Sequence, residues 1–191
     1  MSKAEDLRVI KTRAALQNAF FAMLNETSIE DITINDLCER ACIRRATFYK
    51  HFADKLDFIT YIIKDIRMSF DASFTPLAPT SGPTIEYYVK YAEAVMDFMI
   101  KRETAITKIL ASPMRSVFIE IFMQQNYLDM CERLELSAKG GLLLSVSNEA
   151  ASCMIVGGVA VNLLRWFEHR DLVSSKVMLD EITQLVGMIL G

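Results

Sequence analysis

The chain has 191 residues, of which 52% are hydrophobic, and its formal net charge is −3. This length suffices for two small domains, and the 11 Met and 11 Phe against only 4 Pro and 7 Gly favour an all-helical protein with apolar surface left for a partner. The acidic balance excludes a protein that coats nucleic acid through general charge attraction, although it is compatible with a local basic face.

The first predicted element is a helix over residues 7–25, which follows a polar start at residues 1–6. Its apolar face carries Leu16, Phe20, Met23 and Leu24. A second helix is predicted from Ile34, because Thr33 and Asp36 have the spacing of a capping box.

A short third helix is predicted after a turn at residues 41–43. Phe48 and Phe52 are four residues apart and would both face the core, which directs the polar residues between them elsewhere. Asp54 then predicts the N-cap of a helix over residues 55–74. Two short helices around a turn, the second carrying hydrogen-bond donors, have the geometry that fits a DNA major groove.

The surface of this third helix is predicted to be basic. Residues 40–55 contain five Lys/Arg and one acid, Asp54. Residues 1–55 hold 9 Lys/Arg and 8 Asp/Glu, and the remainder 12 and 16, so the net charges are +1 and −4. Lys and Arg neutralise phosphates and Arg also pairs with guanine edges, so this face could hold DNA and read it. On charge alone, an ordinary solvated helix face remains the alternative.

The stretch Ala-Thr-Phe-Tyr-Lys-His-Phe-Ala-Asp-Lys at 46–55, preceded by Ile-Thr-Ile-Asn-Asp-Leu at 32–37 and Arg44-Arg45, resembles the DNA-binding domain of the tetracycline-repressor (TetR) family. The resemblance implies that the residues facing bases or nearby phosphates are Arg45, Thr47, Lys50 and Arg44. It implies that the residues gripping the DNA backbone are Thr33, Tyr49, His51 and Lys55. Backbone contacts set the register, and base contacts set the sequence preference.

The resemblance also implies two domains in an all-α fold. An N-terminal three-helix helix-turn-helix DNA-binding domain would occupy residues 1–54, and a larger C-terminal helical domain for ligand binding and dimerisation would occupy residues 55–191, with 55–74 as the connecting helix. One departure is Cys42, because the family usually has Gly at this place in the turn, which suits a positive φ. Cys42 therefore predicts either a slightly reshaped turn or a strain of about 1 kcal/mol.

Five more helices are predicted in the C-terminal part. A Pro-rich segment at residues 75–83 breaks the chain before them. They cover residues 84–101, residues 103–111, residues 113–139, a segment opening at 147–149, and a last segment capped by Ser174 or Ser175 and ending near 189. The final two are apolar, and the first of them carries small residues that allow close approach, so we expect a homodimer through these two helices.

The C-terminal part also has an excess of aromatic and Met residues, Tyr87 and Tyr88 among them. Most would be core, but together they could line a cavity for an apolar or aromatic small-molecule effector, oriented by Gln125, Asn126 or Asn162. The candidate ligand-binding residues are Phe70, Tyr91, Phe98, Phe118, Phe122 and Met154.

Cysteine usage favours a reduced, cytoplasmic protein, since there are four Cys and no apolar N-terminal signal. Cys38 and Cys42 are one helical turn apart, but only two His are present and structural zinc needs four converging ligands, so we expect no metal and no cofactor. A redox role for Cys42 stays open. The longest apolar run, residues 153–161, is too short to span a bilayer.

No nucleophile elbow, zinc-hydrolase motif or phosphate loop is present, so we do not expect an enzyme. We expect a dimeric, ligand-responsive transcriptional regulator, more specifically a repressor, on a pseudo-palindromic operator. A ligand would favour a conformer in which the two DNA-binding domains of the dimer have the wrong spacing for the operator. Residues 55–74 would transmit this conformational change. The alternatives are a helical small-molecule-binding or adaptor protein with a vestigial DNA-binding motif and, further behind, an enzyme that uses the aromatic cavity.

Overall fold

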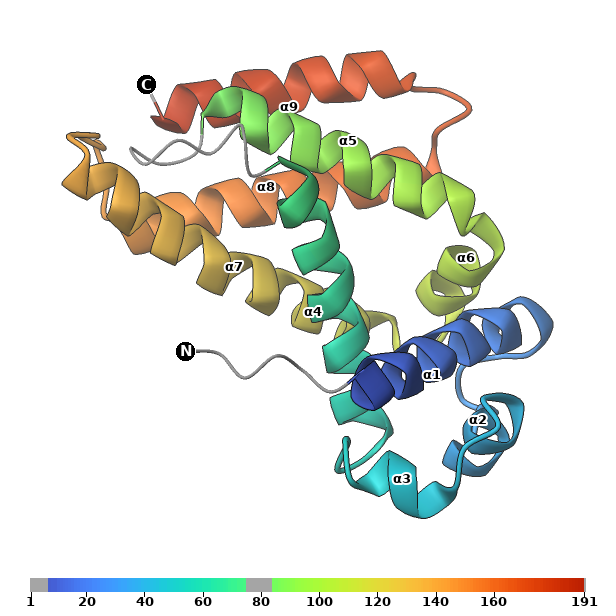
Figure 1. Cartoon of the computed structure of the whole chain (residues 1–191). Helices are drawn as coiled ribbons and strands as arrows, with labels where there is room; N and C mark the ends of the chain where they lie inside the picture. Colours follow the sequence, from blue (N-terminus) through green and yellow to red (C-terminus); the bar gives the residue numbers. More distant parts are fainter. Residues whose placement is uncertain (1–6, 75–83, 191) are drawn as a thin grey trace. The chain divides into compact units, whose positions relative to one another are not determined.

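The computed structural model describes residues 7–74 and 84–190, and every regular element in these ranges is an α-helix (Figure 1). The predicted all-α fold class is confirmed. The helices are α1 (Leu7–Glu26), α2 (Ile34–Arg40), α3 (Arg45–Tyr49), α4 (Lys55–Phe74), α5 (Ile85–Lys101), α6 (Glu103–Ala111), α7 (Arg115–Lys139), α8 (Asn148–Glu168) and α9 (Ser175–Leu190). The predicted helix breaker at residues 75–83 lies outside the described residues.

Contacts between residues divide the chain into two compact units. The N-terminal unit comprises Met1–Ile63 and Arg102–Phe118, and the C-terminal unit comprises Lys64–Lys101 and Ile119–Gly191. Helix α6 and the first turn of α7 therefore group with the N-terminal helices, and α4 and α7 each contribute residues to both units. The expected domain boundary after residue 54 stays a prediction.

An aromatic cluster forms the core of the N-terminal unit. Phe20 of α1, Phe48 of α3 and Phe58 of α4 are each at most 1% exposed, and the Phe58 ring centre lies 5.7 Å from that of Phe20 and 5.8 Å from that of Phe48. Phe52, which follows α3, places its ring 5.4 Å from Phe48 and 5.1 Å from Phe58. Aromatic pairs at such separations contribute about 0.5–1.5 kcal/mol each beyond their buried area. The prediction that Phe48 and Phe52 face inward is confirmed, and this packing fixes the orientation of α3.

Two side-chain caps set where α2 and α4 begin. At α2, the Thr33 Oγ1 accepts from the Asp36 N–H at 3.2 Å, and the Thr33 N–H donates to the Asp36 Oδ2 at 3.2 Å, which is the predicted capping box. At α4, the Asp57 N–H donates to the Asp54 Oδ1 at 2.8 Å, and the Asp57 carboxylate accepts from the Ala53 N–H at 2.9 Å. These caps satisfy N–H groups that the first turn of a helix leaves without an intrahelical partner.

Helix α6 packs against α1 inside the N-terminal unit. The Lys108 Nζ donates to the carbonyl oxygens of Asn25 at 2.9 Å and Thr27 at 3.4 Å, where α1 ends. The Arg102 guanidinium, just before α6, lies 4.7 Å from the centre of the Phe21 ring. A cation at a helix C-terminus satisfies carbonyls that lack an intrahelical partner and opposes the negative end of the helix dipole.

In the C-terminal unit, α5, α8 and α9 pack against one another, and Figure 1 shows α5 running alongside α9. The core residues of α8 and α9 that are at most 3% exposed are Ala151, Ser152, Ile155, Ala160, Leu163, Trp166, Phe167, Ile182 and Val186. Gly158 allows the close approach of α8 and α9, because a Cβ at this position would lie 2.9 Å from a methyl carbon of Leu185. The predicted role of small residues on α8 is therefore filled by Gly158 within the chain itself.

The remaining helix starts agree with the sequence, with one exception. Ser147 and Ser174 cap α8 and α9 by accepting backbone N–H groups at 3.2 and 3.3 Å. The helix predicted to begin at Pro113 begins instead at Arg115. The reason is that the Ser112 Oγ accepts a backbone N–H in a turn that precedes the helix.

Helix α8 is longer than the apolar run that the sequence pattern isolated. By length and composition it is the one helix among the described residues that could cross a membrane. Eight of its residues are buried within the C-terminal unit, where it packs against α5 and α9. A helix that is apolar because it crosses a helical core has the same composition, and we interpret α8 in this way.

Candidate nucleic-acid interface and ligand pocket

The turn between α2 and α3 sets how α3 leaves the core. Cys42 has a φ of 54° and is the one non-Gly residue with a positive φ among residues 7–74 and 84–190. The Cys42 N–H donates to the Glu39 O at 3.0 Å, and the Ile43 N–H donates to the Cys38 O at 2.9 Å. These bonds satisfy the last carbonyls of α2. Of the two predicted outcomes, the turn keeps its left-handed geometry and carries a strain of about 1 kcal/mol.

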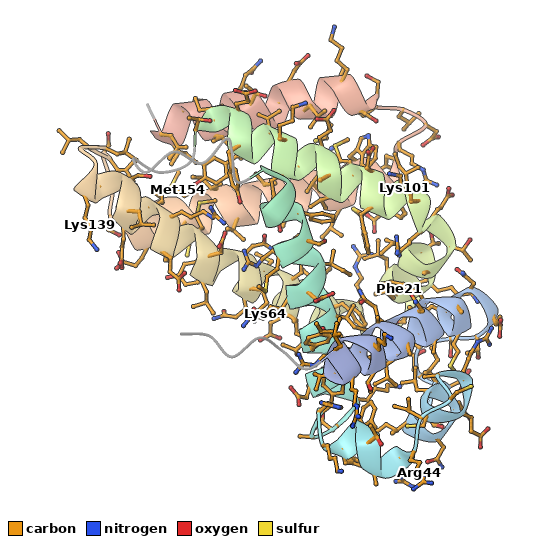
Figure 2. All side chains as sticks on the ribbon, viewed as in Figure 1. Phe21, Arg44, Lys64, Lys101, Lys139 and Met154 are labelled. Carbon is orange, nitrogen blue, oxygen red and sulfur yellow. The ribbon has the colours of Figure 1, made fainter. Side chains whose placement is uncertain are left out.

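Helix α3 presents a cationic surface. Phe48 is buried completely, whereas Arg44, Arg45 and Lys50 are exposed. Figure 2 shows Arg44 at the outer side of the start of α3. Residues 40–53 contain no acid, so every formally charged side chain on α3 and at its two ends is basic, which favours phosphate binding.

Arg45 and Tyr49, one helical turn apart, orient each other. The Arg45 guanidinium donates to the Tyr49 hydroxyl at 3.2 Å and lies 5.5 Å from the centre of the Tyr49 ring. This hydrogen bond raises the pKa of Arg45. An oriented guanidinium loses less freedom when it binds, which suits a bidentate contact with a guanine edge or a phosphate.

Besides Arg45, two of the five cations in residues 40–55 make hydrogen bonds within the chain. Arg40 is one, since both of its terminal nitrogens bond the carboxylate of Glu26 at the end of α1. Hydrogen bonding to Arg40 lowers the pKa of Glu26. The two residues are 14 apart in the chain, so no helical periodicity could have paired them.

Lys55, expected to grip the DNA backbone, is the other engaged cation. Its Nζ donates to the Ile29 O at 2.7 Å and to the Ile32 O at 2.8 Å, which ties the segment before α2 to the start of α4. Desolvation lowers the pKa of Lys55, with Glu30 and Asp31 opposing the shift. In this structure Lys55 braces the backbone with two hydrogen bonds, which leaves at most one ammonium N–H for a phosphate.

The other expected DNA contacts differ in how much of each side chain is accessible. The Thr33 hydroxyl donates to the Asp36 carboxylate at 2.6 Å, and this bond lowers the pKa of Asp36. Thr47 and His51 are partly buried, and the His51 ring centre lies 6.2 Å from that of Phe52. The residues that share the exposed surface of α3 and its ends are Arg44, Arg45, Tyr49 and Lys50. Their contacts with DNA stay predictions.

The cysteines give no sign of a metal centre in the part of the chain that the structure describes. No three His, Cys, Asp or Glu residues cluster there. Cys38 is buried, and its burial raises the pKa of its thiol, whereas Cys42 is exposed. The absence of a metal and of a cofactor stays an expectation.

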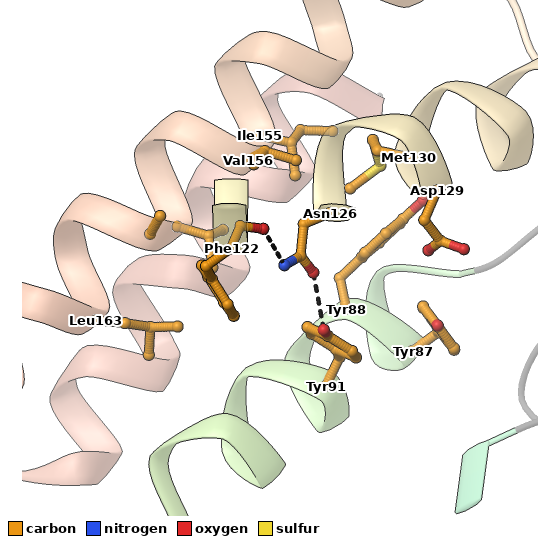
Figure 3. Close-up of a pocket in the computed structure, with 12 residues that line it drawn as sticks. Tyr87, Tyr88, Tyr91, Phe122, Asn126, Asp129, Met130, Ile155, Val156 and Leu163 are labelled. Atoms are coloured by element: carbon orange, nitrogen blue, oxygen red, sulfur yellow. Dashed lines mark hydrogen bonds between the residues drawn. The ribbon is translucent and has the colours of Figure 1, made fainter. Parts of the chain in front are cut away.

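The C-terminal unit contains a pocket between α5, α7 and α8 (Figure 3). Its wall consists of Tyr87, Tyr88, Tyr91, Phe122, Asn126, Asp129, Met130, Ile155, Val156, Val159, Ala160 and Leu163. Two of the six predicted ligand-binding residues, Tyr91 and Phe122, belong to it. Asn126, which the sequence suggested as a polar orienting group, also lies on the wall, whereas Gln125 and Asn162 do not.

The other four predicted ligand-binding residues lie off this wall. The Phe70 ring packs at 5.9 Å from the rings of both Tyr91 and Phe98. Met154 is 53% exposed on α8, and Phe118 belongs to the N-terminal unit. Helical spacing identifies buried rings, but it does not separate a ring that lines a cavity from one that fills the core.

Comparisons with known sequences match only part of the chain. No protein-family profile matches it. The helix-turn-helix transcriptional regulator YxbF of Bacillus subtilis (strain 168) is 36% identical over 99 residues, which cover 51% of this chain and 25% of YxbF. The regulator YdeS of the same organism is 27% identical over 99 residues, which cover 52% of this chain and 48% of YdeS. The chain thus spans about a quarter of one relative and about half of the other.

Solved structures share the fold over nearly the whole chain. A protein from Syntrophomonas wolfei described as a TetR-family transcriptional regulator aligns with a TM-score of 0.70 at 14% identity, over 94% of this chain and 95% of that one. A TetR transcriptional regulator from Streptococcus agalactiae aligns with a TM-score of 0.61 at 19% identity, over 95% and 97%. The dihydroxyacetone kinase operon activator DhaS aligns with a TM-score of 0.53 at 14% identity, over 95% and 99%. Likeness at this level of identity establishes the fold.

Proposed function

We propose that this chain, which has the fold of the TetR-family transcriptional regulators, is a DNA-binding transcriptional regulator that acts as a homodimer on double-stranded operator DNA. The observation that carries the proposal is the exposed cationic surface of α3 above a buried aromatic core. Phe48 and Phe52 fix the helix, and Arg44, Arg45 and Lys50 are exposed around it. Two short helices around a turn place such a surface in the major groove.

The residues on this surface divide into two roles. Arg45 and Lys50 read base edges, and the orientation of Arg45 by Tyr49 supports a directed contact. Arg44, Tyr49 and His51 contact phosphates and set the register, and Thr47 lies between the two groups. Thr33 contributes through the cap that begins α2, and Lys55 through its brace between α4 and the segment before α2.

A dimer is supported by apolar side chains left exposed on the last two helices. Met154 and Val161 of α8 are 53% and 55% exposed, and they are seven residues apart on the same helix face. Val177 and Met188 of α9 are 48% and 78% exposed. Exposed apolar residues on neighbouring helices are typical of a subunit interface. A twofold dimer would place two copies of α3 in successive major grooves of a pseudo-palindrome.

We further propose that the regulator is a ligand-responsive repressor in the cytoplasm. A ligand in the pocket of the C-terminal unit would favour a conformer whose heads no longer match the half-sites, and α4, which contributes to both units, would carry the change. DhaS is described as an operon activator, so the fold is compatible with either sign of regulation. A reporter gene behind the operator, assayed with and without the regulator, decides between them.

The experiment that tests DNA binding is selection of genomic fragments by the purified full chain, followed by anisotropy titration of the best fragment and a scrambled copy across salt concentrations. We expect a pseudo-palindromic fragment to bind at least about a thousandfold more tightly than the scrambled copy, which is the low end for specific regulators. Equal affinity for both duplexes would refute the proposal. It would favour the alternative of a small-molecule-binding or adaptor protein with a vestigial motif.

A further inference from the structure

The pocket in the C-terminal unit is small and mostly apolar. Its volume is about 50 Å³. A cavity of about 150 Å³ admits benzene, and a single water needs only about 10–15 Å³. The pocket is therefore large enough for several atoms, and it is too small for an aromatic ring unless a wall side chain moves.

Most polar groups on the wall already have partners. The Tyr91 hydroxyl donates to the Asn126 Oδ1 at 2.7 Å, and the Asn126 Nδ2 donates to the Phe122 carbonyl oxygen at 2.8 Å (Figure 3). The Asp129 carboxylate accepts from the Arg133 Nε at 2.7 Å and forms an ion pair with Arg67 at 2.8 Å. Each of these groups therefore has at least one partner within the fold.

Tyr88 is the exception. Its side chain is 7% exposed, it lies on the pocket wall, and its hydroxyl has no hydrogen-bond partner among the residues that the structure describes. Figure 3 shows its ring extending from α5 towards α7. Burial raises the pKa of Tyr88, so the hydroxyl keeps its proton at neutral pH and is available as a donor. A buried donor without a partner is unfavourable, and an acceptor that enters the pocket removes this cost.

A bound water is a poor partner for this hydroxyl. Buried waters make two to four hydrogen bonds, and the nearby polar groups Asn126, Tyr91 and Asp129 are engaged with one another or with arginines. A compound with one acceptor atom and an apolar remainder matches the wall better, because the rest of the wall is built from side chains such as Ile155, Val156 and Leu163.

The charges at the pocket restrict the ligand further. A cation would need a carboxylate, but Asp129 already bonds both Arg67 and Arg133. An anion would need one of these guanidiniums to leave Asp129 and would then lie beside that carboxylate. A neutral ligand disturbs neither ion pair.

We propose that this pocket binds a small neutral compound with a carbonyl or ether oxygen, which accepts a hydrogen bond from the Tyr88 hydroxyl while its apolar part contacts α8. This inference rests on the proposed ligand-responsive function and names the chemistry of its effector. At about 50 Å³ the pocket as it stands holds about four non-hydrogen atoms, since one water needs about 10–15 Å³, and a six-atom ketone such as cyclopentanone enters only when a wall side chain moves. Larger relatives of the same chemistry bind if Met130, a flexible side chain on the wall, moves aside.

The test compares two probes of the same shape, cyclopentanone and methylenecyclopentane, which differ in an oxygen against a CH2 group. Each is titrated into the full-length protein, and backbone amide shifts are followed by NMR. We expect cyclopentanone to bind about tenfold more tightly, which corresponds to one hydrogen bond of about 1.4 kcal/mol. In Tyr88→Phe the preference disappears, whereas in Tyr91→Phe, which also loses a hydroxyl from the wall, it persists.

A variant whose pocket is filled by a larger side chain provides the second test of probe binding. Ala160 is buried on the wall, so Ala160→Leu should abolish binding of both probes while the protein keeps its helical content. An unchanged preference for cyclopentanone in Tyr88→Phe, or no binding of either probe at millimolar concentration, would overturn the inference. DNA binding is measured on the same samples without probe. Intact DNA binding together with either of those results refutes the ligand chemistry and leaves the DNA-binding function standing.

Discussion

At the scale of single residues, Cys42 holds the left-handed backbone conformation that usually favours Gly. Its φ of 54° costs a residue with a Cβ about 1–2 kcal/mol, whereas Gly adopts this conformation freely. Cys42→Gly should therefore raise the free energy of unfolding by up to about 1 kcal/mol, the relieved strain being partly offset by the greater freedom of an unfolded Gly. Urea unfolding of the purified variant measures this change.

Cys42→Ala is the matched control, because Ala removes the thiol and keeps the Cβ. Its stability should stay within about 0.5 kcal/mol of the native value, as for most exposed substitutions. If Ala stabilised the protein as much as Gly does, the thiol rather than the left-handed backbone would be the cause. Oxidant sensitivity of the native protein that is absent from both variants would point to a redox role for Cys42.

Arg45 is the residue whose loss should change sequence preference most. Arg45→Ala should weaken binding to the selected operator by about 1–3 kcal/mol and binding to a scrambled duplex much less, because a base contact discriminates and a phosphate contact does not. Anisotropy titrations with both duplexes measure the two losses. Lys139→Ala, which removes an exposed cation from the end of α7, should leave both affinities unchanged. Identical losses on the two duplexes for Arg45→Ala would argue against base reading.

At the scale of elements, the cap of α2 fixes where the helix-turn-helix begins. Thr33→Ala removes the oxygen that accepts the Asp36 N–H and should lower the free energy of unfolding by about 1 kcal/mol, whereas Thr33→Ser keeps the cap. The folded-state pKa of Asp36 is lowered, so its stabilising contribution is present above its ordinary pKa of 3.8 and is lost as pH falls through the lower, folded value. Thermal melts of the three proteins at pH 7 and below pH 3.8 should show the difference narrowing in acid.

Lys55 connects two elements and should behave as a structural residue. Lys55→Ala removes the donor to the Ile29 and Ile32 carbonyls and should lower the free energy of unfolding by about 1–3 kcal/mol. The slope of log K against log salt should stay the same, because no phosphate contact is lost. Arg44→Ala is the comparison, since loss of an exposed cation that is proposed to contact a phosphate should flatten that slope. A flatter slope for Lys55→Ala at native stability would restore its expected role at the DNA backbone.

The elements also show what the sequence could and could not predict. Capping residues such as Ser147 and Ser174, and apolar spacing such as Phe48 to Phe52, are local, and they predicted the helices closely because local backbone geometry decides them. The ion pair of Arg40 with Glu26 and the bonds of Lys55 and Lys108 to backbone carbonyls join distant parts of the chain. The sequence shows that these residues carry a charge or a hydrogen-bond donor, but it does not show which distant residue each of them contacts. The pocket wall also joins distant parts of the chain, so only two of its residues, Tyr91 and Phe122, were among the predicted ligand-binding residues.

At the scale of the whole molecule, the proposed dimer depends on the exposed face of α8. Gly157 and Gly158 are adjacent, yet a Cβ at Gly158 would meet Leu185, whereas a Cβ at Gly157 would meet no atom of the described residues within 4 Å. A side chain at position 157 therefore begins in open space in the isolated chain, where replacing a helical Gly is favourable by up to about 1 kcal/mol. On the same side, Met154 and Val161 are exposed in register with it. A substitution at Gly157 can therefore disturb dimerisation without disturbing the folding of the single chain.

Gly157→Leu should weaken the dimer at least about tenfold while leaving the chain folded, because a large side chain holds two closely packed helices apart. Sedimentation velocity over a concentration series measures the dissociation constant, and circular dichroism checks the fold. Glu135→Leu adds the same apolar side chain to an exposed position of α7 and should leave the dimer intact. If α8 forms the interface, operator affinity should fall together with dimerisation, because two half-sites are held only when the two heads are joined. A Gly157→Leu protein that dimerises as tightly as the native one would place the subunit contact on another surface, and the spacing of the two copies of α3 would then need a different explanation.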